Sequence, residues 1–215
     1  MRTTLQHSFV SYLTIFLCLF FAFGSLSNAA AKPQVDAEED PKVLLAETIN
    51  KILDVLHEEQ YRSMTVDEKN NYLLSMVEER FSLDLLIQRS LGRNWQKLSA
   101  AQRNEFKRLF SKLIVYTYCS RLEEAGNNIR PEFTFGRTID LSRDRLELES
   151  TVQYNNNQLA VYYRLVKQDQ RWEVYDIIVE GVSLLKNYRS QFDSILSRES
   201  VDALLDTLRE KIAAF

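Results

Sequence analysis

The residues best suited to chemistry in this sequence are a tyrosine and an aspartate, Tyr163 and Asp176. The alternation of apolar and polar residues around each predicts that both side chains face the interior of one sheet. A carboxyl and a phenol held together away from water could transfer a proton to or from a small substrate. The same alternation predicts a row of four polar side chains on that face, namely Arg137, Ser150, Tyr163 and Asp176.

This polar row has two interpretations besides catalysis. The simpler one is a hydrogen-bonded layer within the core or near its open end, because a buried polar group without a partner is costly. The other is a rim that meets the polar head group of a ligand. We favour the structural layer, with Asp176 bonded to Tyr163 or to a backbone amide.

Other reactive groups are scarce. The chain has two histidines and two cysteines, too few for a zinc site built from histidine and thiolate ligands. It has neither a glycine-rich phosphate loop nor the Gly-x-Ser-x-Gly motif of serine hydrolases. The formal net charge of −3 gives no sign of bulk nucleic-acid binding. We therefore expect a protein that is not an enzyme and needs no metal or cofactor.

The N-terminus has the composition of a secretory signal peptide. An apolar run over residues 9–23 follows Arg2, and small residues lead to Ala29–Ala31. A membrane anchor is the alternative, but the run is short for a span of about 20 residues. We expect a cleaved leader over residues 1–31, a flexible acidic lead-in over 32–41 and a single domain over 42–215.

Helical periodicity dominates the first half of that domain and returns at its end. Two capping boxes mark helix starts, Thr65 with Glu68 and Ser99 with Gln102, and Gly92 marks a helix end. We expect about six helices, over residues 42–60, 66–80, 81–91, 100–124, 182–196 and 200–213.

After Gly126 the hydrophobic period changes from about 3.6 to 2, which predicts strands. Short turn-like segments between them favour an antiparallel meander. The expected fold class is α+β: a curved, cone-like sheet of four strands roofed by helices, with an apolar cavity between the two layers. Gly181 would be the hinge that folds the next helix over the mouth of this cavity. The strands are expected over residues 133–141, 146–154, 159–166 and 172–179.

Turn lengths predict how these strands pair. We assume two-residue turns at 143–144 and 169–170 and a four-residue loop at 155–158. The predicted pairs are Leu141 with Leu146, Val152 with Val161, Leu165 with both Leu148 and Val174, and Glu149 with Arg164. The predicted inner face comprises Phe133, Phe135, Ile139, Leu148, Val152, Val161, Leu165, Val174 and Ile178.

Apolar residues on this face and on the helices above it could line a ligand cavity, although a filled core would have the same composition. Ten positions are the candidate lining: Phe106, Phe110, Leu113, Val152, Val161, Tyr163, Val174, Ile178, Val182 and Leu185.

One segment resembles a known family. The string W-x-x-Y-D-x-x-x-E-G-V-S, from Trp172 to Ser183, is similar to that of the MlaC/toluene-tolerance family of periplasmic phospholipid-binding proteins. Three upstream segments follow the same family in the same order: Leu91–Trp95, Ser99–Phe106, and Phe110 with Tyr116–Tyr118. The resemblance covers roughly residues 42–213.

The resemblance implies a monomeric carrier in the periplasm that holds the acyl chains of a glycerophospholipid in its cavity. It further implies shuttling between an outer-membrane lipoprotein–porin complex and the MCE-type subunit of an inner-membrane ABC transporter, which maintains outer-membrane lipid asymmetry. A hopanoid or another apolar lipid is the alternative cargo. A small cone-fold enzyme that uses Asp176 and Tyr163, and an adaptor with a filled core, are the competing functions.

Overall fold

The computed structural model describes residues 40–126, 130–154 and 157–215. The predicted leader over residues 1–31 and nearly all of the lead-in lie outside these ranges. Within them, no helix combines the length and the apolar character that crossing a membrane requires.

The helices begin and end at the caps that the sequence predicts. Thr65 and Glu68 form the capping box of α4 (Val66–Glu78). Ser99 and Gln102 exchange hydrogen bonds of 3.0 and 3.2 Å at the start of α6 (Ala100–Gly126). Gly92, with φ of 52°, ends α5 (Leu83–Leu91), as expected for a residue that must leave the helical conformation.

The described helices are seven rather than about six, because the first predicted helix is split in two at Glu58. They are α2 (Pro41–His57), α3 (Glu59–Arg62), α4, α5, α6, α7 (Leu184–Leu196) and α8 (Val201–Ala213), with a 3-10 turn over Gly92–Lys97.

The sheet is an antiparallel meander in the order β1-β2-β3-β4-β5, so it has five strands and not the predicted four. The fifth strand consists of only two residues, after a turn in which Glu180 and Gly181 have φ of 47° and 79°. Two successive positive φ values are typical of a tight hairpin turn. Gly181 is therefore a turn residue between two paired strands. The strands are β1 (Glu132–Ser142), β2 (Arg145–Tyr154), β3 (Asn157–Gln168), β4 (Arg171–Val179) and β5 (Val182–Ser183).

The predicted register is confirmed between β3 and β4 at Leu165 and Val174, but it is wrong between β2 and β3. There Val152 lies opposite Leu159, and Arg164 lies opposite Glu147 instead of Glu149. The cause is a shorter loop, because β3 already begins at Asn157. The resulting slip is two residues, so each side chain keeps its predicted face.

A bulge in β4 does exchange the faces. Val174 pairs with Leu165, but the next pair is Asp176 with Arg164, so Tyr175 is an extra residue on β4. Beyond this bulge Ile177 lies opposite Tyr163, and Ile178 moves to the other face. The predicted inward orientation of Asp176 and Ile178 is therefore wrong.

Irregularities in β1 have a similar effect. Between the pairs at Phe135 and Thr138, the two residues Gly136 and Arg137 oppose a single residue of β2. Ile139 consequently lies opposite Glu147 and is 38% exposed, not inward as predicted. A second irregularity leaves Leu141 without the predicted partner Leu146, which lies opposite Asp140.

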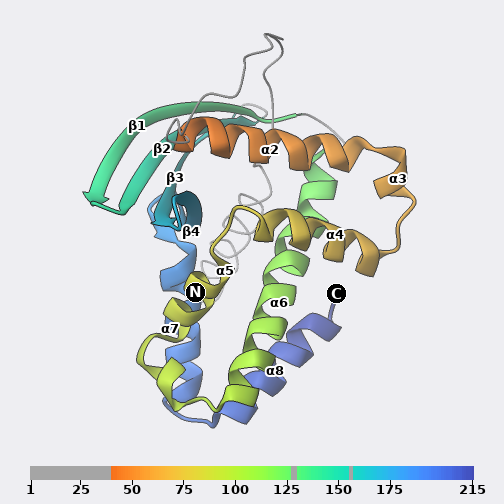
Figure 1. Cartoon of the computed structure of the whole chain (residues 1–215). Coiled ribbons are helices and arrows are strands. Elements are labelled where there is room, and N and C mark those ends of the chain that lie inside the picture. Colours follow the sequence, from red (N-terminus) through yellow and green to blue (C-terminus); the bar gives the residue numbers. More distant parts are fainter. Residues whose placement is uncertain (1–39, 127–129, 155–156) are drawn as a thin grey trace, which may run out of the picture.

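The core has two parts. The sheet arches around α2, so that its concave face packs against α2 and α4, while α5 to α8 form a helical bundle below it (Figure 1). The long helix α6 contributes to both parts, with Val115 in the first and Phe106, Phe110 and Leu113 in the second. We call the first the concave cluster and the second the bundle cluster.

Candidate functional site

The concave cluster is the candidate binding site, because it is the largest apolar surface that sheet and helices share. Its sheet side consists of ten residues from β2, β3 and β4, each 8% exposed or less: Leu146, Leu148, Val152, Val161, Tyr163, Leu165, Trp172, Val174, Ile177 and Val179. Its helical side comes mainly from α2, with Leu45, Ile49, Ile52 and Leu53, and from α4, with Leu73 and Met76.

The structure divides the ten predicted lining residues among three places. Val152, Val161, Tyr163 and Val174 lie in the concave cluster. Phe106, Phe110 and Leu113 lie in the bundle cluster. Ile178 is on the opposite face of the sheet, and Val182 and Leu185 are half-buried where β5 leads into α7.

Aromatic contacts show that the bundle cluster is a packed core. The rings of Phe110 and Tyr188 meet edge to face with centroids 4.7 Å apart, and Phe106 and Phe192 do so at 5.3 Å. Such geometry is typical of stable aromatic packing. The three positions predicted on α6, Phe106, Phe110 and Leu113, therefore hold helices together in the bundle cluster.

Sequence reasoning missed Ile177 and Val179 on β4 and all the contributors from α2. The two strand residues were assigned to the outer face because strict alternation allows no extra residue. The only sign in the sequence is that β4 is apolar on both faces, from Val174 to Val179. The α2 residues have clear helical periodicity, but periodicity does not say which layer a helix covers.

The predicted polar row does not exist as a row. Ser150 and Tyr163 share the concave face, whereas Arg137 and Asp176 belong to the opposite face. Arg137 is largely exposed and binds Glu149 through two nitrogens, at 3.1 and 3.0 Å. Asp176 and Tyr163 therefore do not form one site, which removes the geometric basis of the proton-transfer hypothesis.

Tyr163 is a neutral phenol within the apolar cluster. Its side chain has no exposed surface, and burial raises the pKa of its hydroxyl well above the usual value, while a hydrogen bond with Ser150 opposes this rise. The Ser150 hydroxyl in turn donates to the Val161 carbonyl at 3.0 Å. Ser150 and Tyr163 are thus the two members of the predicted polar row that share the concave face.

Asp176 holds the start of α7. Its carboxylate accepts hydrogen bonds from the Ser183 hydroxyl at 2.8 Å and from the Leu185 backbone amide at 3.0 Å. Arg164 lies 3.4 Å away and also binds Glu147 at 2.9 Å. Burial raises the pKa of Asp176, although these hydrogen bonds and the charge of Arg164 oppose the rise. The predicted bond to a backbone amide is thus confirmed, and the one to Tyr163 is not found.

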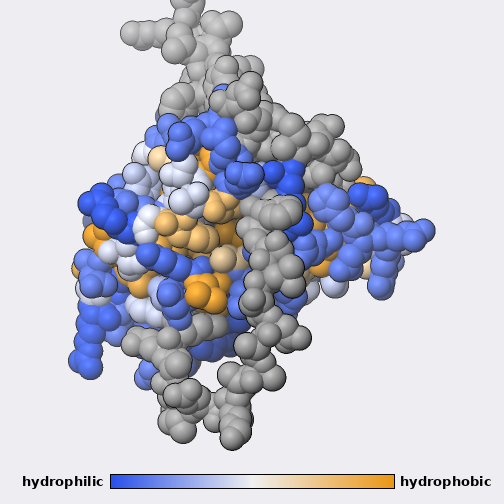
Figure 2. Space-filling view, turned by 90° about the horizontal axis from the view of Figure 1, so that it is seen from above, coloured by the Kyte–Doolittle hydropathy of each residue, from blue (hydrophilic) through white to orange (hydrophobic). Residues whose placement is uncertain are grey.

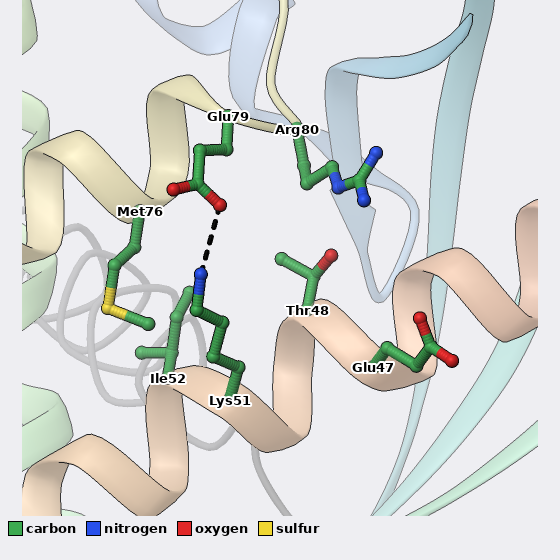
Figure 3. Close-up of a pocket in the computed structure, with 7 residues that line it drawn as sticks. All are labelled: Glu47, Thr48, Lys51, Ile52, Met76, Glu79 and Arg80. Carbon is green, nitrogen blue, oxygen red and sulfur yellow. Dashed lines mark hydrogen bonds and ion pairs between the residues drawn. The ribbon is translucent and has the colours of Figure 1, made fainter.

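A pocket of about 110 Å³ opens between α2 and the end of α4. Its lining combines charged residues with apolar ones (Figure 3). Lys51 and Glu79 form an ion pair of 3.0 Å, and Arg80 and Glu47 lie on the other side of Thr48 from this pair. The full lining is Glu47, Thr48, Lys51, Ile52, Met76, Glu79 and Arg80.

Figure 2 views the molecule from above relative to Figure 1 and shows hydrophobic side chains near the centre with hydrophilic ones around them. Among the residues that the structure describes, no three His, Cys, Asp or Glu side chains are grouped so that they could hold a metal ion.

Comparison with known proteins identifies the family of this chain. A family model described as MlaC protein matches residues 46–210. A protein of Haemophilus influenzae, named intermembrane phospholipid transport system binding protein MlaC, is 23% identical over 185 residues, which are 81% of this chain and 83% of that protein.

A solved structure confirms the fold. The phospholipid-binding protein of Ralstonia solanacearum, determined in complex with a phospholipid, superposes with a TM-score of 0.71 at 23% identity, over 82% of this chain and 98% of the other. The family match covers most of the chain, including the string from Trp172 to Ser183 on which the resemblance was first noted. The chain belongs to the MlaC family.

Proposed function

We propose that this protein is a periplasmic phospholipid carrier that holds acyl chains against the concave cluster, between the sheet and α2 with α4. The observation that carries the proposal is the concave face itself: eight of its ten buried sheet residues are aliphatic, and the other two are the aromatic residues Tyr163 and Trp172. Support also comes from the family, from the name of the Haemophilus influenzae protein and from the lipid bound to the Ralstonia solanacearum protein.

The energetics explain why such a surface is needed. Each methylene that leaves a hydrophobic environment for water costs about 0.8 kcal/mol, so an acyl chain requires on the order of 10 kcal/mol of compensating apolar contact. A continuous apolar lining can supply this, whereas a few exposed side chains cannot. The side chains of the concave cluster are buried against one another, so α2 or α4 must move to admit a chain.

The rest of the proposal follows the family. Export by a leader over residues 1–31 would place the chain in the periplasm. The partners would be the MCE-type subunit of an inner-membrane ABC transporter and an outer-membrane lipoprotein–porin complex, and transfer between them would maintain lipid asymmetry. Neither step requires the carrier to catalyse a reaction.

Native mass spectrometry of the protein purified from a bacterial host tests this function. We expect added mass of phospholipid size, and uptake of labelled phospholipid from vesicles. Val161→Trp would fill part of the site and should reduce loading, whereas Tyr162→Trp, one residue away on the opposite face, should not. Protein without bound lipid that takes up none from vesicles would refute the function, and a bound hopanoid would change the cargo.

Unchanged loading in a folded Val161→Trp variant would refute the assignment of the acyl chains to the concave cluster. Thermal denaturation of both tryptophan variants is the necessary control, because added bulk in a packed core costs about 1–3 kcal/mol.

A further inference from the structure

The pocket between α2 and α4 has the composition of a site for a small polar group attached to an apolar chain. Ile52 and Met76 form its apolar side, and both are buried members of the concave cluster. The pocket is therefore an opening at the surface of the cluster to which acyl chains are assigned. Its charged residues lie where α2 and α4 meet solvent (Figure 3).

The size of the pocket limits what it can hold. About 110 Å³ is several times the roughly 30 Å³ that one water occupies in the liquid. It is well below the roughly 300–1,000 Å³ of pockets that enclose a whole drug-sized ligand. The pocket can hold a small polar head group, but not the acyl chains.

The charges of the pocket are balanced. Lys51 and Arg80 contribute two cations, and Glu47 and Glu79 contribute two carboxylates. Lysine and arginine are suited to bind phosphate, and carboxylates are suited to bind an ammonium group. A ligand that carries both charges a few bonds apart complements this pattern, whereas a purely anionic ligand would meet two carboxylates.

The sheet fixes the backbone position of Glu79 and Arg80. The Val174 backbone amide donates to the Arg80 carbonyl at 3.0 Å, and the Ser82 amide donates to the Val174 carbonyl at 2.9 Å. Arg171 also donates to the carbonyl of Glu79 at 3.0 Å. The segment that follows α4 is thereby attached to β4, whose Val174 and Ile177 belong to the concave cluster.

We propose that this pocket binds the head group of a zwitterionic phospholipid, which would lie across the pocket between the Lys51–Glu79 pair and Arg80 with Glu47, its phosphate at a cation and its amine at a carboxylate. This inference rests on the proposed function and adds to it a preference for one class of head group. Phosphatidylethanolamine has the required chemistry, and phosphatidylglycerol, which lacks the amine, is the matched competitor.

The test is a competition for uptake from vesicles that contain equal amounts of these two lipids with identical acyl chains. Bound lipid is identified by mass spectrometry on the full-length mature protein. We expect Glu79→Gln to shift the bound ratio toward phosphatidylglycerol by about two- to fivefold, the range for one exposed charge contact. Lys51→Gln should shift the ratio by a similar factor toward phosphatidylethanolamine, because it leaves the pocket with a net negative charge that disfavours the anionic phosphatidylglycerol.

This pair of variants separates head-group recognition from a structural effect. Both variants break the same Lys51–Glu79 ion pair, so loosening of α2 from α4 would move the ratio in the same direction in both. Glu47→Gln provides a third case, because Glu47 forms no ion pair within the described part of the chain, and it should act like Glu79→Gln. Glu210→Gln and Lys211→Gln, exposed on α8, are the matched controls and should leave the ratio unchanged.

Equal ratios in the wild type and in all three pocket variants, or shifts of the same sign in Lys51→Gln and Glu79→Gln, would overturn the inference. The proposed function would survive this outcome as long as the total amount of bound lipid is unchanged. If the wild type extracts no lipid, the function itself fails.

Soluble phosphoesters carry the same chemistry as the head group, and isothermal titration with phosphoethanolamine distinguishes the two sources. Binding that Lys51→Gln abolishes, together with an unchanged lipid ratio, would assign the pocket to a soluble ligand and overturn the lipid assignment. A shifted lipid ratio supports the head-group site.

Discussion

Replacement of Asp176 tests whether one buried carboxylate holds the start of α7 against the sheet. The side chain is fully buried and accepts from the Ser183 hydroxyl and the Leu185 amide. Asp176→Ala leaves both donors without this acceptor, and each buried unpaired group costs about 1–3 kcal/mol. We expect the free energy of unfolding to fall by about 2–4 kcal/mol, which lowers the Tm by roughly 5–15 °C.

Urea denaturation with linear extrapolation measures this loss. Ser183→Ala is the matched control. It removes one donor to Asp176, and it removes the hydroxyl that accepts a hydrogen bond from the Lys186 backbone amide at 3.0 Å and so caps α7. That variant should lose only about 1 kcal/mol, the usual cost of a lost cap. A loss below about 1 kcal/mol in Asp176→Ala would refute the reasoning, since it would mean that water or another group satisfies both donors.

The pH dependence of stability tests whether burial raises the pKa of the Asp176 carboxyl. Because burial raises its pKa in the folded state, the folded protein holds this proton more tightly than the unfolded chain. The associated stability is fully present below the unfolded value of 3.8 and is lost as pH rises through the raised pKa. Asp176→Asn stays neutral, so the wild type should lose stability relative to this variant over that window. A difference that is constant with pH would contradict the raised pKa.

Three further predictions concern positions away from the site. Gly92→Ala should lower the free energy of unfolding by about 1–2 kcal/mol, because a positive φ disfavours a side chain. The new Cβ atom would also lie 2.8 Å from the Arg189 guanidinium. An unchanged Tm would contradict this prediction. Gln170→Gly should raise the free energy of unfolding by about 0.5–1 kcal/mol in urea denaturation, because Gln170 has φ of 66° in a hairpin turn; a loss of stability would show that its side chain contributes more than its backbone costs. Phe110→Ala should lower the free energy of unfolding by about 3–5 kcal/mol. It should leave the head-group ratio of bound lipid unchanged, because Phe110 packs on Phe192 in the bundle cluster. A changed ratio would connect that cluster to the binding site.

Helix boundaries were predictable because their causes are local. The caps at Thr65 and Ser99 and the stop at Gly92 depend on side chains within four residues, and the structure confirms all three. The turn at Asp169 and Gln170 is confirmed for the same reason, since both residues have positive φ and join directly paired strands. The family was named from one string that spans β4 and β5, within which the Ser183 hydroxyl donates to Asp176.

The composition of the candidate site was only partly predictable. Val152, Val161, Tyr163 and Val174 were placed correctly on the concave face, because alternation is preserved over uninterrupted strand and survives a slip of two residues. The partner helices were not, since an apolar stripe on a helix shows that it is covered but not by what. This is why residues of α6 were assigned to the cavity and residues of α2 were left out.

The sequence by itself therefore determined most of the helices, four of the five strands, the α+β class and the family of this protein. Only the tertiary structure decided which side chains face each other. One extra residue at Tyr175 places Ile177 and Val179 on the concave face of the sheet and Asp176 on the opposite face, where it is buried. Sequence periodicity is a sum of local preferences, whereas a bulge is fixed by what packs on both faces of the strand at once. On β4 both faces are largely apolar, so either orientation of the strand satisfied the local pattern. The hydrogen bonds that Asp176 accepts from the Ser183 hydroxyl and the Leu185 amide form only in the folded chain.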